Sequence, residues 1–317
     1  MSIANPYLQE HLKHNRNVSA ETARLRRRAT YFSVAVALIL VLSKLVAYVL
    51  TDSVSLLSSL LDSALDTVVS LITLFSVRKA MVPADEDHRY GHGKIEPLAA
   101  IGQAFFIGAS SIFLVIEAIN RFVHPQAVTA PTIGVIVMVV SIILTLALVL
   151  YQMHVTRKTS SMAVEADSLH YKGDFFMNVG VILALILSHH TGLTWFDPAF
   201  AMTVAVILAY SAFKIGREAA NVLMDRELPE HERRAIENIV LAHPRVKGMH
   251  DLRTRSSGVQ SFIEFHLEID GIMPLKAAHD ITEEIEVLLY RAFPTAEVLI
   301  HQEPAGLDDD RLDDRLD

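Results

Sequence analysis

Six long apolar segments, separated by short polar connections, dominate the first two-thirds of the chain. They cover roughly residues 31–51, 54–77, 97–123, 131–154, 163–189 and 197–220. A bilayer core needs about 20 helical residues to cross it, and inside lipid a helix satisfies its own backbone hydrogen bonds. A hydrophobic content of 51 % agrees with an integral membrane protein. We therefore expect an all-α membrane domain, a six-helix bundle over residues 31–220.

The second apolar segment contains two acidic residues. In SLLSSLLDSALDTVVSLITLF, residues 55–75, Asp62 and Asp66 are four positions apart and share one face of a helix. A carboxylate at membrane depth costs roughly 2.5–3.5 kcal/mol on insertion scales, so two on one face need a partner. A bound cation would supply the opposite charge that these two carboxylates need.

The fifth segment repeats this arrangement. Its uninterrupted apolar part, Phe175–Ser188, is too short to span a bilayer, so the helix is expected to extend backward through His170 and Asp174. Two such pairs could supply one imidazole and three carboxylates to a single ion. That set suits tetrahedral Zn²⁺ and tolerates Fe²⁺, Mn²⁺ or Cd²⁺. The alternative is two unrelated pairs, each neutralised near its own helix.

The distribution of basic residues predicts the orientation in the membrane. Loops 78–96 and 155–172 carry Lys and Arg, whereas the connections near 52, 124–130 and 190–196 carry neither. By the positive-inside rule, both termini and the two basic loops are cytoplasmic. Residues 1–30 form a basic cytoplasmic arm, with no cleavable signal peptide apparent. Lys44, inside the first segment, is interpreted as a packing or snorkelling residue.

Two further histidine-containing regions are candidates for metal binding. The loop PADEDHRYGHGK, residues 83–94, brings Asp85, His88 and His92 within eight positions, although such a loop can also be merely solvated. The chain has no cysteine, so any metal must be held by His, carboxylate or backbone groups.

Residues 221–304 predict a small cytoplasmic α+β domain of ferredoxin-like or metallochaperone-like type. The expected order is αββαβ: a helix over Pro229–His243, strands over Val246–Ser256 and Val259–Asp270, a helix over Leu275–Phe293 and a strand over Glu297–Gln302. In the second strand, Ile263, Phe265, Leu267 and Ile269 alternate with Phe262, Glu264, His266 and Glu268.

Four histidines of this domain lie off the expected apolar faces. They are His250, His266, His279 and His301. Individually they could be surface residues, and as a set they suggest metal binding. Residues 305–317 are acidic and are expected to be disordered.

Several motifs together resemble the cation diffusion facilitator family, in its YiiP-like bacterial branch of zinc and ferrous-iron efflux transporters. They are LLDSALD, HRYGHGK, ADSLHYKGD, LMDRELP, HDLRTR and IHQEP, and the resemblance covers roughly residues 25–304. It implies a homodimer in the bacterial inner membrane, with no nucleic-acid partner. The chain lacks the His-rich insertion of eukaryotic vesicular relatives, in agreement with a bacterial type.

The resemblance also implies roles for individual residues. Asp62, Asp66, His170 and Asp174 would form the transport site; Asp85, His88 and His92 a surface-loop site; and His250, His266, His279, His301, Gln302 and Glu303 a cytoplasmic zinc site. Glu303 departs from the family, which usually has Asp there. Lys94 and Asp225 would form a salt bridge that holds two protomers together.

The function expected from these residues is export of a divalent metal, chiefly Zn²⁺, in exchange for protons, regulated by zinc at the cytoplasmic site. Metal ligands must be deprotonated, so metal and protons compete for one site. A passive metal channel and a metal sensor are the alternatives. A metal-dependent hydrolase is disfavoured because no HExxH motif occurs.

Overall fold

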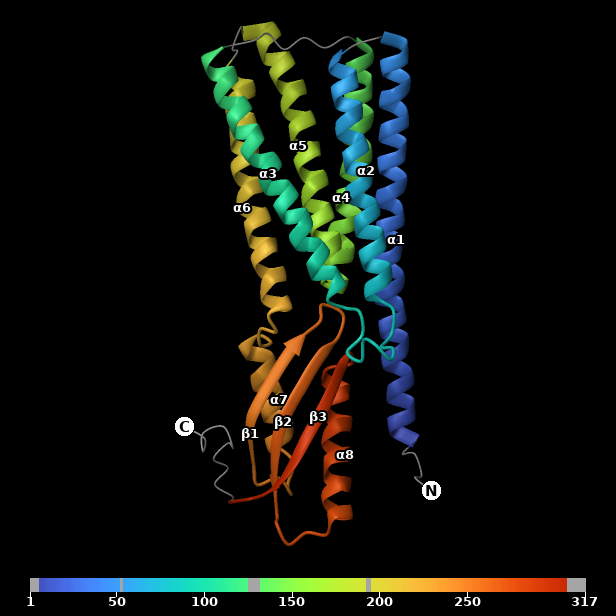
Figure 1. Cartoon of the computed structure of the whole chain (residues 1–317), viewed down its shortest axis with the longest axis vertical. Coiled ribbons are helices and arrows are strands. Elements are labelled where there is room, and N and C mark those ends of the chain that lie inside the picture. The colour runs from blue at the N-terminus through green and yellow to red at the C-terminus, as the bar shows by residue number, and fades with distance from the viewer. Residues whose placement is uncertain (1–5, 52–53, 125–131, 192–194, 307–317) are drawn as a thin grey trace. The chain divides into compact units, whose positions relative to one another are not determined.

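The computed structural model of the chain describes residues 6–51, 54–124, 132–191 and 195–306. The chain divides into two compact units, Thr22–Leu223 and a second that comprises Met1–Glu21 and Met224–Asp317. Figure 1 shows long helices in the first unit and a small sheet with helices in the second. The predicted disordered tail lies outside the described residues from position 307 onward.

The helices of the first unit follow the apolar segments of the sequence. Among the described residues they are α1 (Pro6–Thr51), α2 (Val54–Ala80), α3 (Ile95–Val123), α4 (Thr132–Thr159), α5 (Met162–Thr191) and α6 (Phe196–Leu223). Five of these described helices are long and apolar enough to cross a membrane. The predicted helical membrane domain is confirmed, with the addition that α1 continues back into the N-terminal arm.

Helix α5 differs from its neighbours in composition and position. Its first half carries Glu165, Asp167, Lys172 and Asp174, and α5 does not appear among the five apolar spans of the described chain. It nevertheless begins at Met162, so the predicted backward extension past His170 is confirmed. It contacts α2, α3, α4 and α6, which makes it the central helix of the unit.

Glycines on α5 allow the close approach of α6. A Cβ atom on Gly180 would overlap the ring of Phe200, and one on Gly173 would lie 2.9 Å from a methyl carbon of Leu208. Small residues at such contacts let membrane helices pack closely, where dispersion rather than the hydrophobic effect holds them together. These contacts fix α5, and with it the polar residues of its first half.

The second unit has the predicted αββαβ order. It contains α7 (Glu230–Leu241), β1 (Gly248–Ser256), β2 (Ser261–Ile269), α8 (Leu275–Ala292) and β3 (Ala296–Pro304). The sheet order is β1-β2-β3, with β1 antiparallel to β2 and β2 parallel to β3. A parallel pair requires a crossover connection, which α8 provides.

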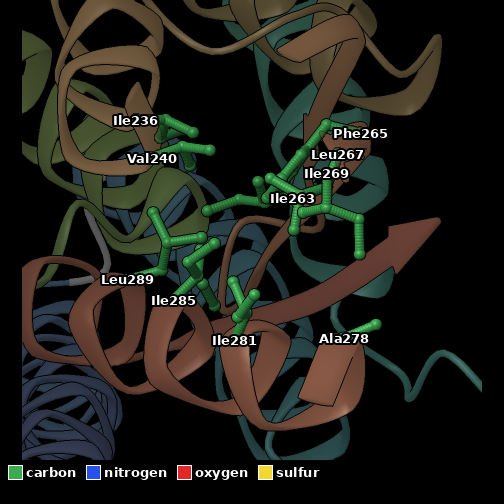
Figure 2. Packing of buried hydrophobic residues seen from close by; sticks show 11 residues of the cluster. Ile236, Val240, Ile263, Phe265, Leu267, Ile269, Ala278, Ile281, Ile285 and Leu289 are labelled. Atoms are coloured by element: carbon green, nitrogen blue, oxygen red, sulfur yellow. The ribbon is translucent and has the colours of Figure 1, made fainter. Parts of the chain in front are cut away.

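The helices cover one face of this sheet and form its hydrophobic core (Figure 2). The core includes the alternating β2 residues Ile263, Phe265, Leu267 and Ile269, as the sequence predicts. On the opposite face Phe262 is also buried, and the guanidinium of Arg255 lies 4.2 Å from the centre of its ring. The other β2 residues of that face, Glu264, His266 and Glu268, are polar.

Candidate metal sites

A cluster of metal-binding residue types lies inside the membrane unit, between α2 and α5. Nε2 of His170 is 2.8 Å from Oδ1 of Asp66 and 3.7 Å from Oδ2 of Asp174. One ligand atom from each of these residues lies within 4.8 Å of the others, a spacing that could hold a metal ion. The side chains of His170 and Asp66 are only 12 % and 13 % exposed. Two helices thus converge on one pocket.

Asp62, the fourth residue expected in this pocket, does not belong to the group of three. It lies one turn from Asp66 on α2, and its side chain is exposed in the single chain. The structure therefore brings together Asp66, His170 and Asp174 and leaves Asp62 at the edge of the cluster.

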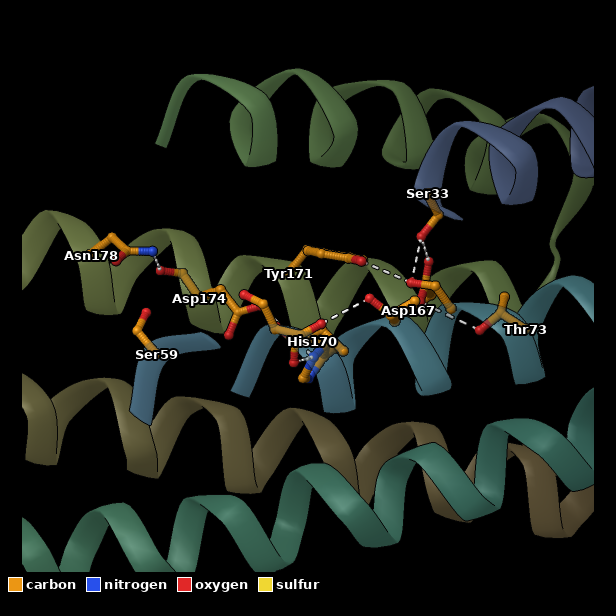
Figure 3. Close-up of polar contacts among 12 residues, drawn as sticks. Ser33, Ser59, Thr73, Asp167, His170, Tyr171, Asp174 and Asn178 are labelled. Carbon is orange, nitrogen blue, oxygen red and sulfur yellow. Dashed lines mark hydrogen bonds and ion pairs between the residues drawn. The ribbon is translucent and has the colours of Figure 1, made fainter. Parts of the chain in front are cut away.

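A second buried carboxylate, which the sequence analysis did not single out, lies one turn before His170. Asp167 accepts hydrogen bonds from Ser33 Oγ at 2.6 Å and Thr73 Oγ1 at 3.4 Å (Figure 3). It also accepts one from Gln152 Nε2 at 2.6 Å. Ser33 is also 3.0 Å from Ser70. These donors come from α1, α2 and α4, so Asp167 connects α5 to three neighbouring helices. The position of Asp167 within the ADSLHYKGD motif was the only hint of its importance in the sequence. Its three neutral hydrogen-bond donors could not be predicted, because they lie on other helices.

The loop after α2 brings its three candidate ligands together. Asp85 Oδ1 is 3.2 Å from Nδ1 of His88, and Asp85 Oδ2 is 3.4 Å from Nε2 of His92. The backbone N–H of His88 donates to Asp85 at 2.7 Å, and this is the main reason why the pKa of Asp85 is lowered. His92 is buried, and neither ring nitrogen makes a hydrogen bond to the described part of the chain. The loop is thus an ordered cluster, with lone pairs available to a metal.

Histidines line up across the three strands of the second unit. His250 of β1 is paired with His266 of β2, which is paired with His301 of β3. The ring centroids are 5.1 Å apart for His250 and His266 and 4.8 Å apart for His266 and His301. A β-bulge follows His250, where Asp251 adopts a φ of 48°. Bulges commonly re-aim side chains next to functional sites.

The Glu303 carboxylate lies at the centre of this row. It is 3.2 Å from Nε2 of His250, 2.7 Å from Nδ1 of His266 and 3.4 Å from Nε2 of His301. One ligand atom from each of His250, His266 and Glu303 lies within 4.8 Å of the others. The glutamate side chain therefore reaches all three histidines of the row.

Glu268 is a further member of this cluster that the sequence analysis did not name as a ligand. It lies 3.0 Å from Nδ1 of His250. A Cβ atom on Gly248 would come within 2.8 Å of its carboxylate, so a larger residue there would force the Glu268 side chain to move. Its position two residues after His266, on the same strand face, was the signal available in the sequence.

The other two expected ligands of the cytoplasmic site lie elsewhere in the single chain. His279 is on α8, where it is exposed and 3.5 Å from Glu283. Gln302 donates from Nε2 to Thr282 Oγ1 at 2.7 Å, which turns it toward α8. Their roles as ligands stay predictions.

The proposed salt-bridge partners belong to different units. Lys94 precedes α3 in the first unit, and Asp225 follows α6 in the second. Asp225 has a φ of 56° and lies 3.7 Å from Arg255. The pairing of Lys94 with Asp225 stays a prediction.

Carboxylate and imidazole groups gathered inside helices that cross a membrane are typical of a cation transporter. The comparisons with known proteins agree with this class. Residues 30–224 match the model of the cation efflux transmembrane domain, and residues 228–305 match that of the cytoplasmic domain of cation efflux proteins, a model named for dimer formation. The chain therefore belongs to the cation efflux, or cation diffusion facilitator, family. It is a transporter and not an enzyme, and the resemblance seen in the sequence is confirmed.

Similar proteins cover almost the whole chain. A cation-efflux pump FieF of Shewanella oneidensis is 48 % identical over 280 residues, covering 88 % of this chain and 94 % of that protein. The FieF pump of Serratia proteamaculans is 46 % identical over 285 residues, covering 90 % and 95 %. Among solved structures, the zinc form of a putative zinc transporter, CzrB, is 39 % identical over 26 % of this chain and 94 % of its own, with a TM-score of 0.25.

Proposed function

We propose that this protein exports a divalent metal ion, with Zn²⁺ as its principal substrate, in exchange for protons. The observation that carries the proposal is the convergence of Asp66, His170 and Asp174 on one pocket within the membrane unit. Mixed imidazole and carboxylate ligands suit Zn²⁺ and accept Fe²⁺, Mn²⁺ and Cd²⁺. Asp62, one turn away, would complete the set of four when the ion is bound.

Proton exchange follows from the chemistry of the ligands. A carboxylate or imidazole that holds a proton cannot bind the metal through the same lone pair, so metal and protons exclude one another. Protons that enter from the outer side would displace the ion there, and alternating access would rock helices around the site. The basic loops support a topology in which both termini lie on the cytoplasmic side of a bacterial inner membrane. The direction of transport is then outward.

The loop and cytoplasmic clusters are proposed as further metal sites. In the cytoplasmic cluster, His250, His266 and Glu303 would hold Zn²⁺, with His301 and Glu268 beside them. His279 is exposed and lies outside the group of His250, His266 and Glu303 in the described chain, and we propose it, with Gln302, as a further ligand of this site. Zinc bound there would shift the protomers of a homodimer relative to each other and so regulate transport.

A metal panel in reconstituted vesicles tests the substrate and the exchange. Zn²⁺, Fe²⁺, Cd²⁺ and Mn²⁺ fluxes are measured with and without an imposed pH difference, beside the Asp66→Asn variant. We expect saturable zinc flux that the pH difference accelerates and that Asp66→Asn abolishes. Flux that is insensitive to the pH difference and does not saturate would favour the passive channel.

A binding experiment separates the cytoplasmic site from the transport site. Tight zinc binding by the full chain should survive Asp62→Ala and weaken with His266→Ala. If the two variants bind zinc alike, the cytoplasmic assignment is wrong.

A further inference from the structure

Lys44 is a cationic residue within the apolar span of α1, Ala20–Leu50. Its Nζ donates to Ser63 Oγ at 2.6 Å and to the backbone oxygen of Ser59 at 3.2 Å, both on α2. These acceptors are neutral. An ammonium group at membrane depth is costly unless it faces opposite charge or water, so the two serines alone do not explain its position.

The positions of the serines place this ammonium beside the proposed transport pocket. Ser59 comes three residues before Asp62, and Ser63 three residues before Asp66. Residues three apart are neighbours on a helix surface. An amine held by both serines therefore lies on the face of α2 that carries the two carboxylates. Lys44 interacts electrostatically with Asp66, Asp174 and Asp62.

A charge balance suggests what Lys44 does there. When the four proposed ligands are deprotonated, as metal binding requires, they carry three negative charges, and Lys44 reduces the total to two. One divalent ion then balances the charge of these four ligands and Lys44. We propose that Lys44 is a specificity-determining residue of transport, a fixed counter-charge that matches the deprotonated ligands to one divalent cation and weakens the pocket's hold on that ion. This inference rests on the proposed function of the pocket.

Removing the charge of Lys44 should tighten zinc binding, whereas structural damage to the pocket would weaken it. A pocket without Lys44 would keep one uncompensated negative charge after metal binding, so it would bind the ion more tightly and release it more slowly. For Lys44→Met we expect a zinc Kd lower by at least about tenfold at pH 8, on the order expected for one charge in a partly desolvated site. Both KM and the maximal flux should fall. If Lys44 only held α1 against α2, its substitution would weaken zinc binding.

The experiment is a zinc titration of the full chain in detergent, in a background that carries His88→Ala and His266→Ala to silence the other two clusters. Lys44→Met and Lys44→Gln are compared with Lys44→Arg, which keeps the charge and should restore a Kd within about threefold of the background. Ser63→Ala removes the hydrogen bond but not the charge, and should not tighten binding. Circular dichroism shows which of the two neutral variants is folded.

The outcomes distinguish this inference from the proposed function. If Asp66→Ala leaves zinc binding in this background unchanged, the pocket is not the metal site and both proposals fail. Suppose instead that Asp66→Ala abolishes zinc binding, but that a folded Lys44→Met or Lys44→Gln variant binds zinc no more tightly than the background. Lys44 then only holds the two helices together, and this inference alone is overturned.

Discussion

A buried ion pair connects three helices of the membrane unit near the start of α3, and its removal should be costly. Nη1 of Arg26 lies 3.0 Å from Oε2 of Glu96, and the side chains are only 7 % and 1 % exposed. Arg26 also donates to the backbone oxygen of Thr159, and Ser161 donates to Glu96. The pair thus holds α1 and α3 against the α4–α5 connection, which leads into the helix that carries His170.

The expected magnitude follows from this burial. Removal of one partner leaves an uncompensated charge, which costs roughly 3–5 kcal/mol, whereas replacement of both by apolar residues is often neutral. Since about 1 kcal/mol shifts Tm by roughly 2–4 °C in a domain of 150–250 residues, we expect Glu96→Leu to lower Tm by roughly 6–20 °C. The double variant Arg26→Met with Glu96→Leu should recover most of that loss.

The assay is thermal unfolding of the purified chain in detergent, followed by circular dichroism. The matched control is Glu117→Gln, which removes an ion pair between Glu117 and Arg121 of α3. The two groups are 2.9 Å apart, and each side chain is about two-fifths exposed. Exposed pairs contribute at most about 1 kcal/mol, so this variant should melt within about 4 °C of the wild type. If Glu96→Leu melts together with Glu117→Gln, the argument from burial is refuted.

Two further variants test packing and electrostatics. Gly180→Ala should destabilise the membrane unit by roughly 1–3 kcal/mol because the new methyl meets Phe200, and Phe200→Leu should rescue it; unchanged melting contradicts the close contact. Hydrogen bonds from His243 and Arg245 lower the pKa of Glu284 below its ordinary 4.5, so its ionised form stabilises the fold above that value and the stabilisation is lost as pH falls through the folded pKa. Glu284→Gln should therefore be slightly less stable than wild type at pH 7 in denaturant unfolding, by well under about 1 kcal/mol for this exposed group. The difference should shrink as the pH falls below 4.5, and a difference that stays constant with pH would have another cause.

Much of the fold could be predicted because hydrophobic periodicity is a local property of the sequence. Apart from residue 131, which lies outside the described residues, the predicted apolar segments lie within helices α1 to α6, and the alternation in β2 placed Ile263 and Leu267 on the core side. Helix α5 was predicted to extend through His170 because its apolar part alone cannot span a bilayer. These arguments need only lengths and spacings.

What could not be predicted depends on contacts between distant segments. The row of His250, His266 and His301 requires the strand register and the parallel pairing of β2 with β3. The hydrogen bonds of Asp167 depend on three other helices. The contact of Lys44 with Ser63 could not be predicted either, because it joins two different helices. From the sequence alone, a single lysine within a membrane span is ordinarily interpreted as a snorkelling residue.

The most direct test of the central claim places equal zinc concentrations on both sides of vesicles that contain the protein, and then imposes a pH difference alone. If zinc and protons compete for the pocket of Asp66, His170 and Asp174, zinc should move against its developing gradient toward the more acidic side. His170→Ala should abolish this movement. Absence of net zinc movement in the wild type, in vesicles that still conduct zinc down a zinc gradient, would contradict proton exchange at this site.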